Sequence, residues 1–316
     1  MFDEETAAAV RQLDASFPAV HRMTGAEARA AIAARRAPVE NLGDVARTED
    51  RTVPGPEGPL PVRLYFPSPP EAPPRPVIVF FHGGGFVFCD IDSHDGFCRE
   101  MAKGTDSVVV SVGYRLAPEH PAPAAALDAS AAVAWAAEEA AAFGGDAGRL
   151  LVAGDSAGGN LAAVAALAAR DTGQDLAGQI LVYPVIDPAC DTESYTARGS
   201  GYGNTRAAMD WYWRQYLPGG RLPEPVEQVA PLRAASLRGL PPAVVVTAGL
   251  DPLCDEGRAY GRALADSGVP AVRRHYPELF HGFLTVAGLR PAQSARAVLW
   301  HDVRNLTATA SRGAAE

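Results

Sequence analysis

Short, continuous apolar runs alternate with helix-length stretches along most of this chain. Unbroken apolar runs, rather than strict alternation of polar and apolar residues, are typical of strands covered on both faces. The stretches between them supply the covering layers, which predicts an α/β fold with a mostly parallel, doubly wound central sheet. The expected strands are residues 77–81, 108–112, 150–153, 180–183, 243–247 and 271–276, and the expected helices are residues 124–143, 157–170, 256–266 and 292–306.

Two segments do not follow this alternation. Residues 1–50 read as two helices, and residues 188–229 carry Trp211 and Trp213 in a further expected helix. Ligands of doubly wound sheets bind beyond the carboxyl ends of the strands, so insertions at that edge are placed to cover the site. We therefore expect a helical cap formed by residues 1–50 and 188–229, over a core formed by residues 51–187 and 230–316.

A proline-rich tract, residues 67–76, stands between the strand-like runs 62–66 and 77–81. Its prolines indicate a stiff, exposed connection rather than a linker between domains. We expect the two runs to be neighbours in the sheet, joined as a hairpin or as adjacent strands.

Ser156 lies in the sequence Gly154-Asp155-Ser156-Ala157-Gly158, between an apolar run and an alanine-rich stretch. The pattern predicts a serine on a sharp strand-to-helix turn, where a side chain at either glycine would collide with the neighbouring strand or helix. The unpaired backbone N–H groups at the start of that helix, Ala157 among them, would face a negative charge developing beside the serine. We interpret Ser156 as a nucleophile for acyl chemistry.

Three consecutive glycines, Gly83 to Gly85, follow the apolar strand 77–81 and His82. No side chains block the backbone N–H groups of such a loop, so it is a second source of hydrogen-bond donors. By itself a glycine triplet indicates a flexible loop. Beside the serine turn it indicates an oxyanion hole.

Five ordered motifs together resemble the hormone-sensitive-lipase-like (family IV) bacterial esterases of the α/β-hydrolase superfamily. The resemblance runs from about residue 62 to the C-terminus, and residues 1–50 match only by position, as the N-terminal part of the family's cap. It implies an α/β-hydrolase fold and places Gly84 and Gly85 in the oxyanion hole, with Gly83 shaping the loop. The motifs are His82-Gly83-Gly84-Gly85, Tyr114-Arg115-Leu116-Ala117-Pro118-Glu119-His120, Gly154-Asp155-Ser156-Ala157-Gly158-Gly159-Asn160, Asp251-Pro252-Leu253 and His281-Gly282-Phe283.

A serine nucleophile needs a base and an acid, and the chain has seven histidines. In α/β-hydrolases the nucleophile, the acid and the histidine follow one another along the chain, which favours His281 after the last expected strand. Asp251 follows the strand 243–247, at the same sheet edge, although an aspartate there could also cap the next helix. Asp187 is the rival acid. The match of the Asp251 motif to the family favours Asp251.

The charge and composition argue against several kinds of partner. The net charge is −9 and the 28 basic residues are dispersed, so a nucleic-acid surface is not expected. No apolar run would span a membrane and no secretory signal is visible after the acidic N-terminus, so we expect a cytoplasmic protein. Cys89, Cys98, Cys190 and Cys254 read as reduced thiols without zinc-type spacing, with a Cys89–Cys98 bridge left open.

Together the site residues and the resemblance predict a serine carboxylic-ester hydrolase that works through an acyl-enzyme, without metal or cofactor. The resemblance implies small-molecule ester substrates with acyl groups of roughly two to eight carbons, and a capped site favours dissolved molecules. Two alternatives stay open: an amidase, lactonase or formamidase with the same site, and a non-catalytic small-molecule-binding member of the fold. The resemblance also allows a homodimer. The aromatic residues expected to border the pocket are Phe86, Phe88, Trp211, Trp213 and Phe283.

Overall fold

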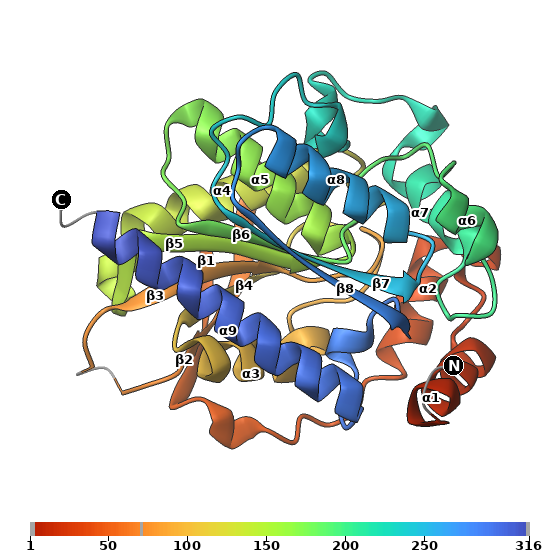
Figure 1. Ribbon diagram of the computed structural model, residues 1–316, viewed down its shortest axis with the longest axis horizontal. Coiled ribbons are helices and arrows are strands. Elements are labelled where there is room, and N and C mark those ends of the chain that lie inside the picture. Colours follow the sequence, from red (N-terminus) through yellow and green to blue (C-terminus); the bar gives the residue numbers. More distant parts are fainter. Residues whose placement is uncertain (1–3, 70–71, 314–316) are drawn as a thin grey trace.

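The computed structural model describes residues 4–69 and 72–313 (Figure 1). Residues 1–3 of the acidic N-terminus and residues 70–71 of the proline-rich tract lie outside the described residues, as do residues 314–316. The strands are β1 (Arg47–Gly55), β2 (Gly58–Phe66), β3 (Arg75–Phe81), β4 (Val108–Val112), β5 (Gly145–Asp155), β6 (Gly178–Val182), β7 (Ala243–Leu250) and β8 (Ala271–Phe280). The α-helices are α1 (Glu4–Ser16), α2 (Gly25–Ala33), α3 (Asp95–Thr105), α4 (Ala124–Glu139), α5 (Ala157–Thr172), α6 (Glu193–Ala197), α7 (Arg206–Tyr216), α8 (Cys254–Asp266) and α9 (Arg290–Gly313).

The described strands form one eight-stranded sheet in the order β1-β2-β4-β3-β5-β6-β7-β8. The β1–β2 and β2–β4 pairs are antiparallel, and every pair from β4 to β8 is parallel. The predicted α/β fold with a mostly parallel sheet is confirmed.

Helices cover both faces of the sheet. Figure 1 shows α4, α5 and α8 on one side and α3 and α9 on the other. Successive residues of β3 point to opposite faces, so Val77 and Val79 pack in the core under α4 and α5, while Ile78 and Phe80 pack in the core with α3 and α9. Because both faces are buried, the central strands read as unbroken apolar runs.

The sheet departs from the sequence-based expectation at its first strands. The predicted pairing of β2 with β3 is wrong, because β4 lies between them and the proline-rich tract crosses over it. β1 was not predicted at all. It is an edge strand with the polar sequence RTEDRTVPG, in which only Val53 is buried, so it lacks the apolar signature of a central strand. Its first residues, 47–50, fall within the segment expected to belong to the cap.

The two segments that interrupt the alternation lie near one another in the fold. Figure 1 shows α1, α2, α6 and α7 gathered beyond the arrowheads of β7 and β8. The sequence starts α2 with a capping box, in which Thr24 and Glu27 each accept from the other's backbone N–H, and Thr205 caps α7. The boundaries between cap and core stay predictions. No helix in the described ranges is both long and apolar enough to cross a membrane.

Candidate active site

Ser156 occupies the sharp turn between β5 and α5. Its backbone, at φ 55° and ψ −117°, is in a region that non-glycine residues rarely adopt. A β-carbon on Gly154 would lie 2.1 Å from the carbonyl oxygen of Gly158, and one on Gly158 would lie 1.9 Å from that of Phe81. The turn closes this tightly only because both flanking residues are glycine. It holds the serine hydroxyl at the carboxyl edge of the sheet.

His281 bridges Ser156 and Asp251. Its Nε2 atom lies 2.9 Å from Ser156 Oγ, and its Nδ1 atom lies 2.8 Å from Asp251 Oδ2. A carboxylate accepts only, so Nδ1 carries the proton it donates to Asp251, and Nε2 is left to accept from the serine hydroxyl. Asp251 directly follows β7 and His281 directly follows β8, which explains how residues far apart in sequence meet at one edge.

Asp251 is fully buried and also accepts a hydrogen bond from the Leu253 N–H through Oδ1, at 2.9 Å. The helix-capping role considered from the sequence and the contact with His281 therefore use different oxygens of one carboxylate. The rival acid, Asp187, is engaged elsewhere: Arg233 donates to both of its oxygens at 2.6 Å. The structure brings Asp251, and not Asp187, to His281.

The glycine loop is tied to the serine turn through Asp155. The Gly83 N–H donates to Asp155 Oδ1 at 2.8 Å. Gly84 and Gly85 then adopt φ values of 120° and 59°, conformations open to glycine. Tyr114 donates to the carbonyl oxygen of His82, which fixes the loop from the other side. Oxyanion-hole roles for Gly84, Gly85 and Ala157 stay proposals.

Asn160 anchors the first turn of α5. Its side-chain amide donates to the carbonyl oxygens of Val185 and Val229, both at 2.9 Å. Asp155 and Asn160 therefore support the serine turn from two sides.

The five aromatic residues expected at the pocket are all buried. Phe86 stacks on Tyr216 with ring centroids 4.0 Å apart, and Phe88 meets Tyr212 edge-on. These contacts join the segment after the glycine loop to α7. A pocket-lining role for Phe86, Phe88, Trp211, Trp213 and Phe283 stays a prediction, and their exposed fractions run from 0% for Phe283 to 6% for Trp213.

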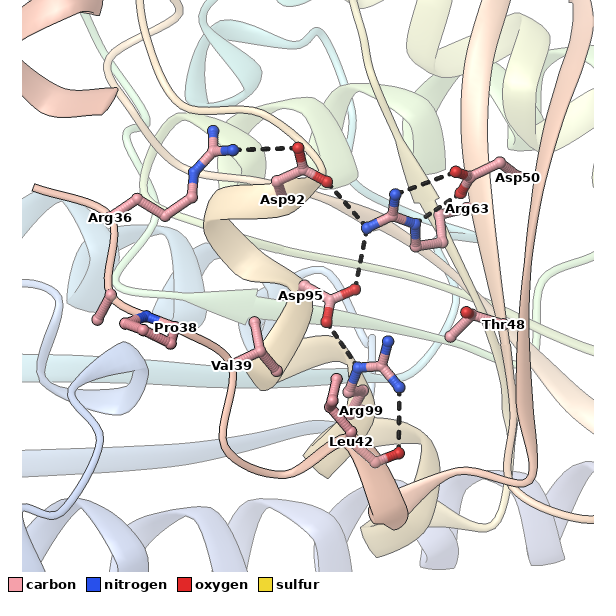
Figure 2. Close-up of a pocket in the computed structure, with 11 residues that line it drawn as sticks. Arg36, Pro38, Val39, Leu42, Thr48, Asp50, Arg63, Asp92, Asp95 and Arg99 are labelled. Carbon is pink, nitrogen blue, oxygen red and sulfur yellow. Dashed lines mark hydrogen bonds and ion pairs between the residues drawn. The ribbon is translucent and has the colours of Figure 1, made fainter. Parts of the chain in front are cut away.

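A hollow of about 490 Å³ lies away from Ser156, between the segment after α2, the β1–β2 hairpin and the start of α3. Its charged groups are already paired with one another, as Figure 2 shows. Arg63 donates to Asp50, Asp92 and Asp95, and Arg99 donates to Asp95. From the segment after α2, Arg36 donates to Asp92, and Arg99 donates to the carbonyl oxygen of Leu42, so the network holds this segment against the core.

Sequence reasoning missed three residues that surround the site. Tyr183, with φ 33°, packs its ring 4.8 Å from the His281 ring. Glu256 is buried and accepts from the Ile186 N–H, and burial raises its pKa to about 8. His94 contacts Asp155. Their neighbours in sequence are ordinary for a strand end or a helix start, so no local pattern marks them. All four cysteines are free thiols, which excludes the Cys89–Cys98 bridge left open above.

A sheet of this order, with a serine on a glycine-flanked turn and a histidine and an aspartate beside it, is that of an α/β-hydrolase. Residues 78–285 match the family described as alpha/beta hydrolase fold. The chain belongs to this family.

Three relatives illustrate the likeness. Esterase LipI of Mycobacterium tuberculosis is 45% identical over 248 residues, which cover 78% of each chain. Carboxylic ester hydrolase LipN of the same organism is 44% identical over 252 residues, which are 78% of this chain and 66% of LipN. A solved structure of the Pyrobaculum calidifontis esterase superimposes with a TM-score of 0.88 at 35% identity, covering 97% of this chain and 99% of the other. The predicted resemblance to hormone-sensitive-lipase-like esterases is confirmed.

Proposed function

We propose that the protein is a serine carboxylesterase in which Ser156 is the nucleophile, His281 the general base and acid, and Asp251 the residue that orients His281. The relatives named as esterases support the enzyme class. The observation that carries the residue roles is the continuous contact from Ser156 Oγ through the His281 ring to Asp251, at 2.9 and 2.8 Å. Such a chain activates a hydroxyl that is otherwise a weak nucleophile at neutral pH.

In the first half of the reaction, Ser156 Oγ attacks the ester carbonyl carbon while its proton passes to His281 Nε2. The buried Asp251 carboxylate stabilises the imidazolium that forms. Negative charge collects on the carbonyl oxygen, where backbone N–H groups of Gly84, Gly85 and Ala157 would donate to it. The carbon–oxygen bond to the alcohol then breaks, and the alcohol leaves with the proton from His281.

The second half repeats these steps with water. His281 removes a proton from a water molecule, which attacks the acyl group on Ser156. The acid leaves and the serine recovers its proton. Each group therefore returns to its starting protonation state.

The substrates proposed are dissolved small esters with short to medium acyl groups. Two features support this proposal: Ser156 is only 8% exposed, and α7 packs on the loop beside it. A buried nucleophile favours single dissolved molecules over lipid droplets. A cytoplasmic location and a homodimer both stay predictions.

A substrate panel tests the proposal. We expect the wild-type protein and Ser130→Ala, whose hydroxyl donates to a carbonyl of its own helix, to hydrolyse p-nitrophenyl butyrate, and Ser156→Ala to lose nearly all of this activity. Matched butyryl amide and lactone substrates should be hydrolysed with lower kcat/KM. A preference for the amide or lactone would instead identify the alternative hydrolases. Binding of esters without turnover by the wild-type protein would identify a non-catalytic member of the fold.

A further inference from the structure

A chain of polar contacts runs inward from Ser93, an exposed residue just before α3, to the glycine loop. Ser93 Oγ lies 3.0 Å from His94 Nδ1, and His94 Nε2 lies 3.3 Å from Asp155 Oδ1. The same Asp155 oxygen accepts the Gly83 N–H at 2.8 Å. Asp155 immediately precedes Ser156, so the chain ends between the nucleophile and the loop that faces it.

Asp155 is a carboxylate in a place where a carboxylate is unfavourable. It is 5% exposed, and burial by itself would raise its pKa. The contact with His94 and the hydrogen bond from the Gly83 N–H hold the pKa of Asp155 below its usual value. An ionised group here opposes the negative charge that forms on the substrate oxygen, unless its own charge is balanced by a partner.

The contact from Gly83 to Asp155 also determines where the glycine loop lies. A β-carbon on Gly83 would sit 2.4 Å from Asp155 Oδ2, so loop and carboxylate are in direct contact. A shift of the Asp155 carboxylate would therefore move Gly83, and with it the N–H groups of Gly84 and Gly85. Oxyanion-hole donors must lie within a few tenths of an ångström of their place to be effective.

His94 is held so that its Nε2 atom faces Asp155. The Ser93 N–H donates to Asp90 Oδ1 at 2.8 Å, and Ser93 Oγ donates to the Asp90 carbonyl oxygen at 2.6 Å. The His94 ring also lies against Phe80 and His82, with centroids 5.9 and 5.7 Å away. These contacts on several sides fix the orientation of the His94 ring.

We propose that His94 is a positioning residue for the oxyanion hole, which acts by holding Asp155 and through it Gly83. This inference rests on the proposed function, because it assigns a task only if the glycine loop binds an oxyanion. His94 touches neither Ser156 nor His281 in the contacts of the described residues, so its effect is on the loop and not on the base.

Two conservative variants separate the two contacts of His94. In His94→Gln the side-chain amide reaches about as far as Nε2 and can still donate to Asp155. In His94→Asn the side-chain amide reaches only as far as Nδ1. This variant can therefore keep the contact with Ser93 Oγ, but it cannot contact Asp155. His301→Asn, at an exposed position of α9, is the matched control.

Three quantities are measured: kcat per active site, KM, and the dissociation constant of an alkyl boronic acid. The active sites are counted by titration with an organophosphate. The boronic acid reports on the oxyanion hole, because its tetrahedral adduct on the serine uses that hole. Loss of a whole oxyanion-hole donor costs about 10²- to 10³-fold. We expect His94→Asn to lower kcat and boronic acid affinity together by about tenfold or more, with KM within about twofold, and His94→Gln to stay within about threefold of wild type.

Equal behaviour of the Gln and Asn variants, or a change in KM without a change in boronic acid affinity, would overturn the inference. If His94→Asn does not fold, His94→Met, whose side chain of similar volume cannot donate to Asp155, should still lower kcat and boronic acid affinity together. If neither kcat nor boronic acid affinity changes in that variant, the inference about His94 is wrong. Activity in Ser156→Ala would instead overturn the proposed function, whatever the His94 variants do.

Discussion

Gly85 of the glycine loop lies directly beneath the ring of Tyr212 in α7, so that a β-carbon on Gly85 would sit 2.3 Å from Tyr212 Cδ1. Helix α7 therefore rests on the loop proposed to bind the oxyanion. Phe86, with φ 63°, continues the contact by stacking on Tyr216. The position of α7 and the shape of the oxyanion hole are thus linked.

We predict that Gly85→Ala lowers kcat by about 10- to 100-fold, because the new methyl group must displace either the loop or Tyr212. Gly144→Ala is the control. Gly144 has φ 77°, against 59° for Gly85, but nothing lies within 4 Å of its added β-carbon. Gly144→Ala should lower the free energy of unfolding by about 1 kcal/mol and leave kcat per titrated active site unchanged. Equal kcat in both variants would refute the link between α7 and the loop.

Asp251→Asn should lower kcat by on the order of 10⁴-fold, because an amide does not hold the His281 tautomer or stabilise its imidazolium. Asp187→Asn should lower it by less than about tenfold, since that carboxylate pairs with Arg233. Steady-state kinetics on one short-chain ester ranks the two variants. The opposite ranking would transfer the acid role to Asp187.

The buried carboxyl of Glu256 makes the stability of the fold depend on pH. Burial raises its pKa from the ordinary 4.5 to about 8. Between these values the folded protein keeps a proton that the unfolded chain has released, so this group's contribution to the free energy of unfolding falls as the pH rises from about 4.5 to about 8.

Glu256→Gln removes this titration and keeps an acceptor for the Ile186 N–H. The fall in Tm between pH 5 and pH 8 should therefore be smaller in Glu256→Gln than in wild type, by roughly 2 °C or more. Thermal unfolding at both pH values checks this. Glu138→Gln, at an exposed position of α4, should behave as wild type. An unchanged pH dependence in Glu256→Gln would mean that Glu256 is ionised in the fold.

Acyl-chain length should affect kcat/KM only until the pocket is full. Each added methylene contributes at most about 0.8 kcal/mol, or roughly fourfold, so kcat/KM should rise and then level or fall within roughly two to eight carbons. A series of p-nitrophenyl esters measures this. A steady rise through long chains, with a jump when the substrate forms an emulsion, would identify a true lipase.

Two of the three residues proposed for the chemistry carry a signal of their own in the sequence. Ser156 stands between glycines that its turn requires, and His281 follows the last strand in the expected chain order. Asp251 was favoured over Asp187 by its position after the strand that precedes the His281 strand, together with the family resemblance. The central strands were readable from burial on both faces.

The rest depends on contacts between distant parts of the chain. The side chains on both faces of β1 reach solvent except for Val53, so no apolar run marks this strand. The place of β4 between β2 and β3 is a matter of pairing, which local sequence does not encode. His94 meets Asp155 from 61 positions away in sequence, and only the folded structure brings the two side chains together.

The central claim is that Ser156 carries the acyl group, and covalent labelling tests it most directly. The wild-type protein is treated with an aryl phosphonate, and the adduct is located by peptide mass spectrometry while residual esterase activity is followed. We predict one adduct, on Ser156, whose extent equals the loss of activity, and no adduct in Ser156→Ala. An adduct on another residue that accounts for the inactivation, or full labelling of Ser156 with activity retained, would contradict the account.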